Sequence, residues 1–302
     1  MNKQIEKEII AGVLRRLQEE GYPGSRPAAA DSERQADSSA PMAVSAGSGQ
    51  APLALGPVHA IGVANPKNGE ALQVMRKSTP ARILLGRAGA RPRTDSYLRF
   101  QADHAAAVDA VFMDVSEEVL AANSLLALQT VVRDKDEYLM KPELGKRLSE
   151  EAKRAIAAKV EKGRQVQIIV VDGLSSTSIE ANIDDILPAL IQGLKNEGLS
   201  VGTPIFIKYG RVGVMDDVAP LVDCEVLVEL IGERPGLITA ESMSAYLAYR
   251  PDRQTVEADR TVISNIHRGG TPPAEAGAHL ATVVRKMVDN KAGGVKLSQL
   301  LK

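Results

Sequence analysis

Three short segments combine glycine with polar or charged side chains, and each directly follows an apolar run. They are Asp172-Gly173-Leu174-Ser175-Ser176-Thr177, Tyr209-Gly210-Arg211-Val212-Gly213 and Gly232-Glu233-Arg234-Pro235-Gly236. Glycine lets the backbone approach a ligand closely or adopt a positive φ, and the neighbouring hydroxyl, carboxylate and guanidinium groups can hydrogen-bond it. If the apolar runs are neighbouring strands of a parallel sheet, the segments meet at its carboxyl edge, where such sheets bind ligands. Tight strand-to-helix turns also need glycine, so one segment alone fits a purely structural role.

The other chemistry-bearing residues do not form a familiar catalytic set. The four histidines (His59, His104, His267 and His279) and the single cysteine, Cys224, lack the spacing of a metal site. The chain has neither a Gly-x-Gly-x-x-Gly nor a Walker A string, which argues against nicotinamide and ATP as ligands, and it has no Gly-x-Ser-x-Gly. His267 could be a base or a ligand, although a hydrogen-bonded loop histidine is the simpler interpretation. Cys224 begins an apolar run and is expected to be a small core residue.

A basic, glycine-rich loop at residues 86–94 (GRAGARPRT) precedes a predicted helix. Thr94 is a plausible N-cap for that helix. Arg87, Arg91 and Arg93 lie near the helix N-terminus and could hold an anion there. Ion pairs within the chain or to a partner chain would explain the arginines equally well, so their role stays open.

The N-terminal part of the chain predicts a tethered helix. Residues 3–20 place six aliphatic side chains on one stripe: Ile5, Ile9, Ile10, Val13, Leu14 and Leu17. Gly21 and Pro23 then end the helix. The following segment is made of alanine, serine, glycine and proline without apolar periodicity, which is typical of a flexible linker. We therefore expect an amphipathic helix within residues 1–22 and a linker over residues 23–57.

The rest of the chain predicts an α/β body, with a Rossmann-like doubly wound parallel sheet preceded by a mostly helical part. In residues 58–160 we expect a short strand at 81–85 and a helix at 94–112. The inward positions expected on that helix are Tyr97, Phe100, Ala107, Val108 and Val111. In residues 161–302 apolar runs alternate with helical patterns, as in a parallel sheet covered by helices. The expected strands are 166–173, 204–209, 225–231, 244–249 and 260–263, and the expected helices are 179–197, 216–222 and 272–290.

Composition excludes several function classes. The net charge is −1 and aromatic residues make up 3% of the chain, so neither a basic surface nor a stacking platform for nucleic acid is expected. No apolar run approaches the roughly 20 residues of a membrane span. A single cysteine allows no intramolecular disulfide, which fits a reducing compartment. These features indicate a cytoplasmic protein with neither nucleic acid nor membrane as a partner.

Several strings resemble the small subunit of ethanolamine ammonia-lyase, over about residues 62–293. They are GRAGARPRT, VVDGLSS, GTPIFIKYGRV, LIGERPGL, VEADRTVISNIH and GGTPP. The resemblance implies an adenosylcobalamin-dependent carbon–nitrogen lyase that converts ethanolamine into acetaldehyde and ammonia by a radical route. It implies a hetero-oligomer in which the cobalt-containing corrinoid lies between the chains and the large subunit carries the catalytic residues. This agrees with the lack of a catalytic set here.

The resemblance also carries three corrinoid contacts to positions of this chain. Val212 follows Gly-Arg in the second glycine-containing segment, and Glu233 lies within Gly-Glu-Arg-Pro-Gly of the third. Val262 lies after Ala-Asp-Arg-Thr, where the family usually has cysteine, so packing or a backbone contact remains possible but a thiol role does not. Two of the three contacts thus fall in segments that the strand-end rule selects independently.

Two further expectations concern the cofactor and the location. Asp-x-His-x-x-Gly, whose histidine replaces the lower base of cobalamin in many proteins, does not occur in the chain. The cofactor is therefore expected to stay base-on, as the resemblance also implies. Family members often reside in bacterial microcompartments, so we expect the N-terminal helix to bind the shell. A self-associating or interfacial helix is the alternative for that segment, and a non-catalytic scaffold of a microcompartment is the alternative for the whole chain.

Overall fold

The computed structural model describes residues 61–79 and 81–302. The expected helix and linker of residues 1–57 lie outside the described residues. No helix within the described ranges is both long and apolar enough to cross a membrane.

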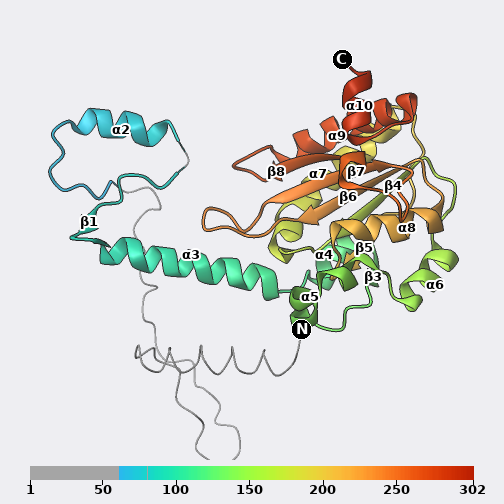
Figure 1. Cartoon of the computed structure of the whole chain (residues 1–302), viewed down its shortest axis with the longest axis horizontal. Coiled ribbons are helices and arrows are strands. Elements are labelled where there is room, and N and C mark those ends of the chain that lie inside the picture. Colours follow the sequence, from blue (N-terminus) through green and yellow to red (C-terminus); the bar gives the residue numbers. More distant parts are fainter. Residues whose placement is uncertain (1–60, 80) are drawn as a thin grey trace, which may run out of the picture. The chain divides into compact units, whose positions relative to one another are not determined.

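A six-stranded mixed sheet organises the fold (Figure 1), with its strands in the order β3-β5-β4-β6-β7-β8. The strands are β3 Leu126–Gln129, β4 Val166–Val171, β5 Ile205–Lys208, β6 Val226–Gly232, β7 Met243–Tyr249 and β8 Arg260–Ile266. Strands β3, β5, β4 and β6 are mutually parallel, whereas β7 is antiparallel to β6 and β8 is antiparallel to β7. Every residue of β4 is buried, as its mainly apolar sequence predicted.

The prediction of an entirely parallel sheet was wrong at its last two strands. Parallel neighbours need a long crossover, usually a helix. The connections at residues 233–242 and 250–259 contain no α-helix, only the short 3-10 helix η3 (Glu257–Asp259). The chain therefore returns antiparallel at both β7 and β8.

Two further differences lie in the N-terminal part of the described chain. β3 was not predicted, because it has only four residues and lies beside a charged stretch. The strand expected at residues 81–85 does not form. A two-residue hairpin follows instead, made of β1 (Arg87–Ala88) and β2 (Arg91–Pro92).

Helices cover both faces of the sheet. On one face, α7 (Ser176–Asn196) and α9 (Pro273–Asn290) pack on Ile168, Val170 and Val228. On the other, α6 (Glu150–Lys159) and α8 (Met215–Val222) pack on residues such as Ile169 and Val171. The side chains of successive β4 residues thus alternate between two hydrophobic cores, one on each face of the sheet. This confirms the prediction that helices cover both faces. Cys224 is buried in the second core as a free thiol.

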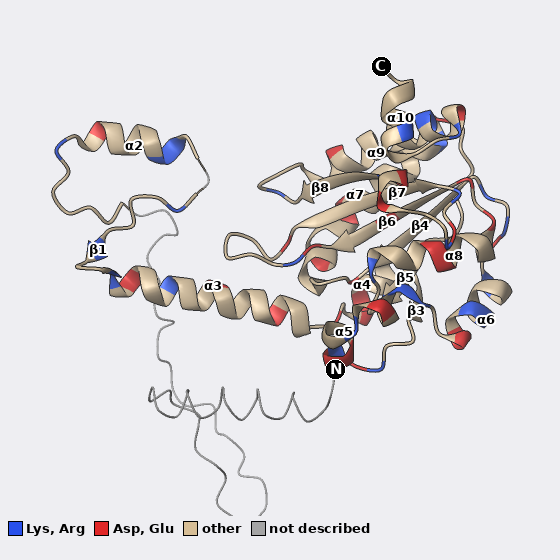
Figure 2. Ribbon diagram, viewed as in Figure 1, with Lys and Arg blue, Asp and Glu red and all other residues tan. Residues whose placement is uncertain are grey.

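The remaining elements are α2 Gly69–Lys77, α3 Thr94–Phe112, α4 Glu117–Ala122, α5 Lys135–Met140, η1 Pro142–Lys146, η2 Val212–Val214 and α10 Gly294–Leu300. Helix α3 has the predicted bounds, but its N-cap is Arg93, without a side-chain cap bond. Tyr97 and Val108, which we expected to point inward, are 52% and 41% exposed. Only the small Ala107 and Ala110 are buried. Four of the 19 residues of α3 are aspartate or arginine, and most of its ribbon is tan in Figure 2.

Glu229, in the middle of β6, is fully buried, and neither carboxylate oxygen has a hydrogen-bond partner among the described residues. Burial raises the pKa of Glu229 well above its ordinary value of 4.5, and Arg260 opposes this only in part. Between about pH 4.5 and the raised pKa, Glu229 is therefore protonated in the folded chain and ionised in the unfolded chain. Folding stability therefore falls as the pH rises from about 4.5 through the folded pKa.

We expect Glu229→Met to remove this pH dependence and to stabilise the full chain by about 1–3 kcal/mol near neutral pH, because it removes two unsatisfied buried oxygens. Thermal unfolding at about pH 5 and about pH 8 measures the effect, which must be larger at the higher pH. Glu118→Met, on the exposed surface of α4, is the control. A gain of equal size at both pH values would contradict the assignment.

Candidate functional site

The three glycine-containing segments meet at the carboxyl edge of the sheet. They follow β4, β5 and β6, which are parallel, and β4 lies between the other two. From β4 the chain passes through α7 to β5 on one side, and from β5 it passes through α8 to β6 on the other side. Because α7 and α8 cover opposite faces, the connections diverge at this point. Such a switch point is where open α/β sheets form a ligand crevice.

A pocket of about 230 Å³ lies at this switch point. Its lining comes from all three segments, from α5 and from β7: Tyr138, Gly173, Leu174, Arg211, Val212, Ile231, Gly232, Glu233, Arg234, Ser244 and Tyr246. The structure thus brings together Val212 and Glu233, two of the three residues singled out in the sequence. The structure does not place Val262 in the lining of this pocket. It is 45% exposed on β8 and pairs with Tyr246, so it shares the face of the sheet that borders the pocket.

Asp172 ties the first segment to the second. Its buried Oδ1 accepts a hydrogen bond of 2.8 Å from the backbone N–H of Tyr209. Tyr209 has a φ of 58°, in the left-handed region that residues with side chains rarely adopt. The bond from Asp172 therefore helps to hold a turn that the local sequence does not favour, immediately before Gly210 and Arg211.

The first segment is also tied to the third. The backbone N–H of Leu174 donates to the carbonyl of Gly232 over 3.1 Å. Gly173 has a φ of 58°, and a Cβ at that position would lie 2.4 Å from the same carbonyl oxygen. Only glycine fits this approach. The glycine that suggested a ligand loop therefore serves the contact between two loops.

A lysine and two tyrosines surround Asp172. The Lys135 Nζ lies 4.0 Å from the Asp172 carboxylate and within 5.5 Å of the ring centroids of Tyr138 and Tyr209. Burial raises the pKa of Asp172 to about 6, although Lys135 and backbone N–H groups oppose the shift. Burial likewise lowers the pKa of Lys135. Burial thus disfavours the charged forms of both Asp172 and Lys135. Such desolvated pairs occur at functional sites and also as structural ion pairs.

Glu233 carries the negative charge of the pocket. Its Oε1 accepts hydrogen bonds from the Ser244 hydroxyl over 2.6 Å and from the Asn265 N–H over 2.9 Å. Burial acts to raise the pKa of Glu233, but these hydrogen bonds outweigh it and the pKa lies below its usual range. Glu233 is therefore ionised at neutral pH, half-buried, and can accept hydrogen bonds from a ligand.

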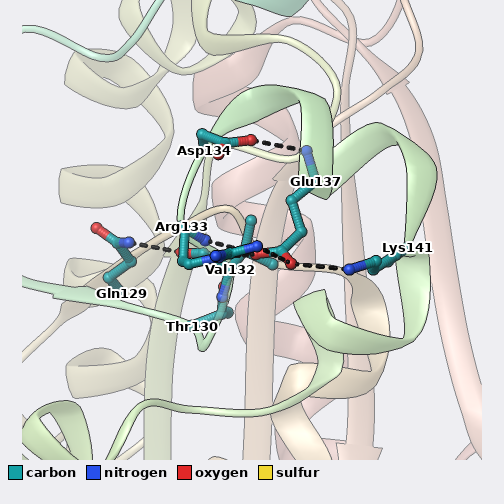
Figure 3. A network of polar contacts seen from close by, with 7 residues as sticks. All are labelled: Gln129, Thr130, Val132, Arg133, Asp134, Glu137 and Lys141. Atoms are coloured by element: carbon teal, nitrogen blue, oxygen red, sulfur yellow. Dashed lines mark hydrogen bonds and ion pairs between the residues drawn. The ribbon is translucent and has the colours of Figure 1, made fainter.

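A polar network within residues 129–141 stabilises α5, which provides Lys135 and Tyr138 (Figure 3). Asp134 caps the helix, because its Oδ1 accepts the Glu137 N–H over 2.8 Å. Glu137 in turn accepts hydrogen bonds from Arg133 and from Lys141, each within 3.1 Å. The Tyr138 hydroxyl then donates to the carbonyl of Gly210 over 2.8 Å, which connects α5 to the second segment.

A larger pocket of about 650 Å³ adjoins the first, and both are lined by Leu174, Arg211 and Arg234. Its other walls come from α3, from Leu139, and from the third segment and the residue after it: His104, Ala107, Val108, Val111, Phe112, Pro235, Gly236 and Leu237. Sequence reasoning missed this pocket and the contribution of α5. The strand-end rule points only to segments after strands, and α5 lies in a charged stretch with no motif.

The remaining candidate residues have local roles in the structure. The His267 Nδ1 accepts the Gly269 N–H over 3.1 Å, and its Nε2 lies 2.8 Å from the Asn265 Oδ1, as in a hydrogen-bonded loop histidine. Arg87 donates to the carbonyl of Ala90 within the β1–β2 hairpin. Arg93 lies 3.7 Å from Asp95 and donates to the carbonyl of Gly62. Arg91 is exposed.

The side chains that line the pocket are suited to binding a ligand. Within the described part of the chain, no three histidine, cysteine or carboxylate side chains are grouped as a metal site. The pocket offers one ionised acceptor, two guanidinium groups and the apolar surfaces of Val212, Leu174 and Tyr246. A ligand with amide donors, apolar edges and an acidic group would satisfy all of them.

Comparison with known proteins identifies the family. The profile of the ethanolamine ammonia-lyase light chain matches residues 69–298. The ethanolamine ammonia-lyase small subunit of Clostridium perfringens is 54% identical over 235 residues, which cover 78% of this chain and 80% of that protein. Those of Clostridioides difficile and Clostridium tetani are each 52% identical over the same coverage. The chain therefore belongs to the family of ethanolamine ammonia-lyase small subunits and is a subunit of a carbon–nitrogen lyase.

Proposed function

We propose that this chain holds adenosylcobalamin against a large catalytic subunit, in the conversion of ethanolamine into acetaldehyde and ammonia. The observation that carries the proposal is the pocket at the switch point, where Val212 and Glu233 come together from two different loops. The rim of a corrin ring has neutral amide side chains between apolar edges. The Glu233 carboxylate can accept from the amides, while Val212 and Tyr246 can pack on the edges, so the residues present fit the group.

The chain contributes binding and orientation to the reaction. Bound adenosylcobalamin supplies radical chemistry through cleavage of its cobalt–carbon bond. Glu233 fixes the ring by accepting amide hydrogen bonds, and Val212 excludes water from the contact. Val262, beside Tyr246 on the open face of β8, adds a packing contact in place of the cysteine usual in the family. The catalytic residues are expected on the large subunit.

We also propose that the cofactor keeps its own lower base on cobalt. The sequence lacks the Asp-x-His-x-x-Gly string. His267 has both ring nitrogens engaged within its own loop, so it is not free to replace the base. His104 projects from α3 into the larger pocket, away from Glu233 and Val212.

The first test is Glu233→Ala in the complex of this chain with the large subunit. A hydrogen bond to a charged group contributes about 1.5–3 kcal/mol, so cobalamin affinity should fall by about ten- to a hundredfold while subunit assembly is retained. Spectroscopic titration with cobalamin measures the affinity. Glu241→Ala, an exposed change in the same β6–β7 connection, should leave it unaltered. Full affinity in the Glu233 variant would argue against a corrinoid contact there.

The second test is Val212→Asp. Val212 is half-buried at the pocket and packs against the core under α8. A charge in this nearly dry contact should reduce cobalamin loading by at least about tenfold in complexes that still assemble. Size-exclusion chromatography with absorbance at corrin wavelengths reports assembly and loading together. Val295→Asp, on exposed α10, is the matched control. A variant that folds, assembles and loads fully would rule out the contact.

Finally, we propose that the chain works inside a bacterial microcompartment and that its N-terminal helix, predicted from the sequence alone, binds the shell. The stripe of aliphatic residues at i, i+4 and i+8 spacing suits a groove on a partner. Residues 1–20 fused to a fluorescent protein should collect in shell particles in cells that make them. The double variant Ile9→Glu, Leu17→Glu should stay diffuse. A diffuse unmodified fusion in such cells would refute the targeting role.

A further inference from the structure

Four basic side chains gather at the carboxyl edge of the sheet, and two of them lack an acidic partner. Lys135 lies 4.0 Å from Asp172, and Lys208 lies 2.8 Å from Asp114. Arg211 and Arg234, by contrast, form no ion pair with any described residue of the chain. The Glu233 charge is taken up by hydrogen bonds from Ser244 and Asn265. The edge therefore offers two guanidinium groups that an external anion could neutralise.

Arg211 is fixed in position without such an anion. Its Nη2 donates to the carbonyl of Tyr138 over 3.0 Å, and its guanidinium lies 4.0 Å from the Tyr138 ring centroid. Its backbone N–H donates to the carbonyl of Gly145 over 2.8 Å. The Nε is buried and has no partner among the described residues. Buried polar atoms are seldom left unpaired, so this N–H indicates an acceptor that the chain itself does not supply.

The two arginines stand at the junction of the two pockets. Among the described residues, Leu174, Arg211 and Arg234 line both pockets: the one of about 230 Å³, which is also lined by Glu233 and Val212, and the one of about 650 Å³ beside it. A ligand that extends from one pocket into the other must pass the guanidinium groups. An anionic group at that point of the ligand would meet both of them.

We propose that Arg211, assisted by Arg234, binds the phosphodiester of cobalamin and so selects complete cobalamin over cobinamide, which lacks the phosphate and the lower base. This inference rests on the proposed function. The amide side chains of the corrin ring are neutral, and the phosphodiester is the one acidic group of the cobalamin. Two N–H groups of a guanidinium match two phosphate oxygens, which a single ammonium does not.

The test compares two corrinoids in the assembled complex with the large subunit. Cyanocobalamin and dicyanocobinamide are titrated against wild-type, Arg211→Met, Arg211→Lys and Arg234→Met complexes, with binding read from corrin absorbance. Arg211→Met should lower cobalamin affinity by about ten- to a hundredfold and change cobinamide affinity by less than about twofold. Arg211→Lys should lose less cobalamin affinity, because lysine keeps the positive charge but lacks the two parallel N–H groups of the guanidinium. Arg253→Met, an exposed arginine away from both pockets, should bind both corrinoids normally.

Three results would overturn the inference. Equal loss of both corrinoids in Arg211→Met would mean that Arg211 supports the loop or the corrin ring and not the phosphate. Unchanged cobalamin affinity would mean that no anion is bound there. Weaker subunit association in the absence of any corrinoid would mean that a carboxylate of the large subunit neutralises Arg211. A wild-type complex that binds neither corrinoid would instead contradict the proposed function. If Glu233→Ala and Val212→Asp lost cobalamin affinity while the Arg211 variants kept it, the proposed function would stand and only the phosphodiester contact would be rejected.

Discussion

The buried carboxylate of Asp172 is the contact on which the site depends. It accepts the N–H of Tyr209 at the start of the second loop, and it lies beside Lys135 on α5. The residues that follow it, Gly173 and Leu174, contact the third loop at Gly232. One short segment after β4 thus sets the distance between the loops that carry Val212 and Glu233. The parallel strands bring the three loops to one edge, and Asp172 and its neighbours fix how they face one another.

The carboxyl edge of the sheet contains several buried polar groups that lower the folding stability of the chain. Asp172 and Lys135 are both largely shielded from water. The Arg211 Nε and both carboxylate oxygens of Glu229 are buried and have no hydrogen-bond partner within the described chain. Glu229 lies on β6, two residues before Ile231, which lines the pocket. Each such group destabilises the folded chain to some degree. Polar groups held beside a pocket in this way are expected where a protein keeps them ready for a ligand.

Much of this arrangement could be predicted from the sequence, because it follows from buried strands. The mainly apolar runs at β4, β5 and β6 identified three loops, and the family resemblance pointed to Val212 and Glu233 within two of them. β3 and α5 could not be predicted in this way: β3 is four residues long, and α5 lies in a charged stretch where Tyr138 resembles any other surface residue. The antiparallel β7 and β8 were misjudged because apolar alternation indicates a strand but not its direction. Arg211 was visible in the second loop, but its lack of an acidic partner appears only in the folded chain.

We propose that these three loops hold the corrinoid in the assembled enzyme. Hydrogen–deuterium exchange of the complex with the large subunit, with and without adenosylcobalamin, tests it most directly. We predict slower exchange on cofactor addition in peptides that contain residues 172–176, 209–213 and 232–236, with no change at α6 or α10. Saturated cofactor binding, seen in the visible spectrum, with unchanged exchange in all three loops would contradict it.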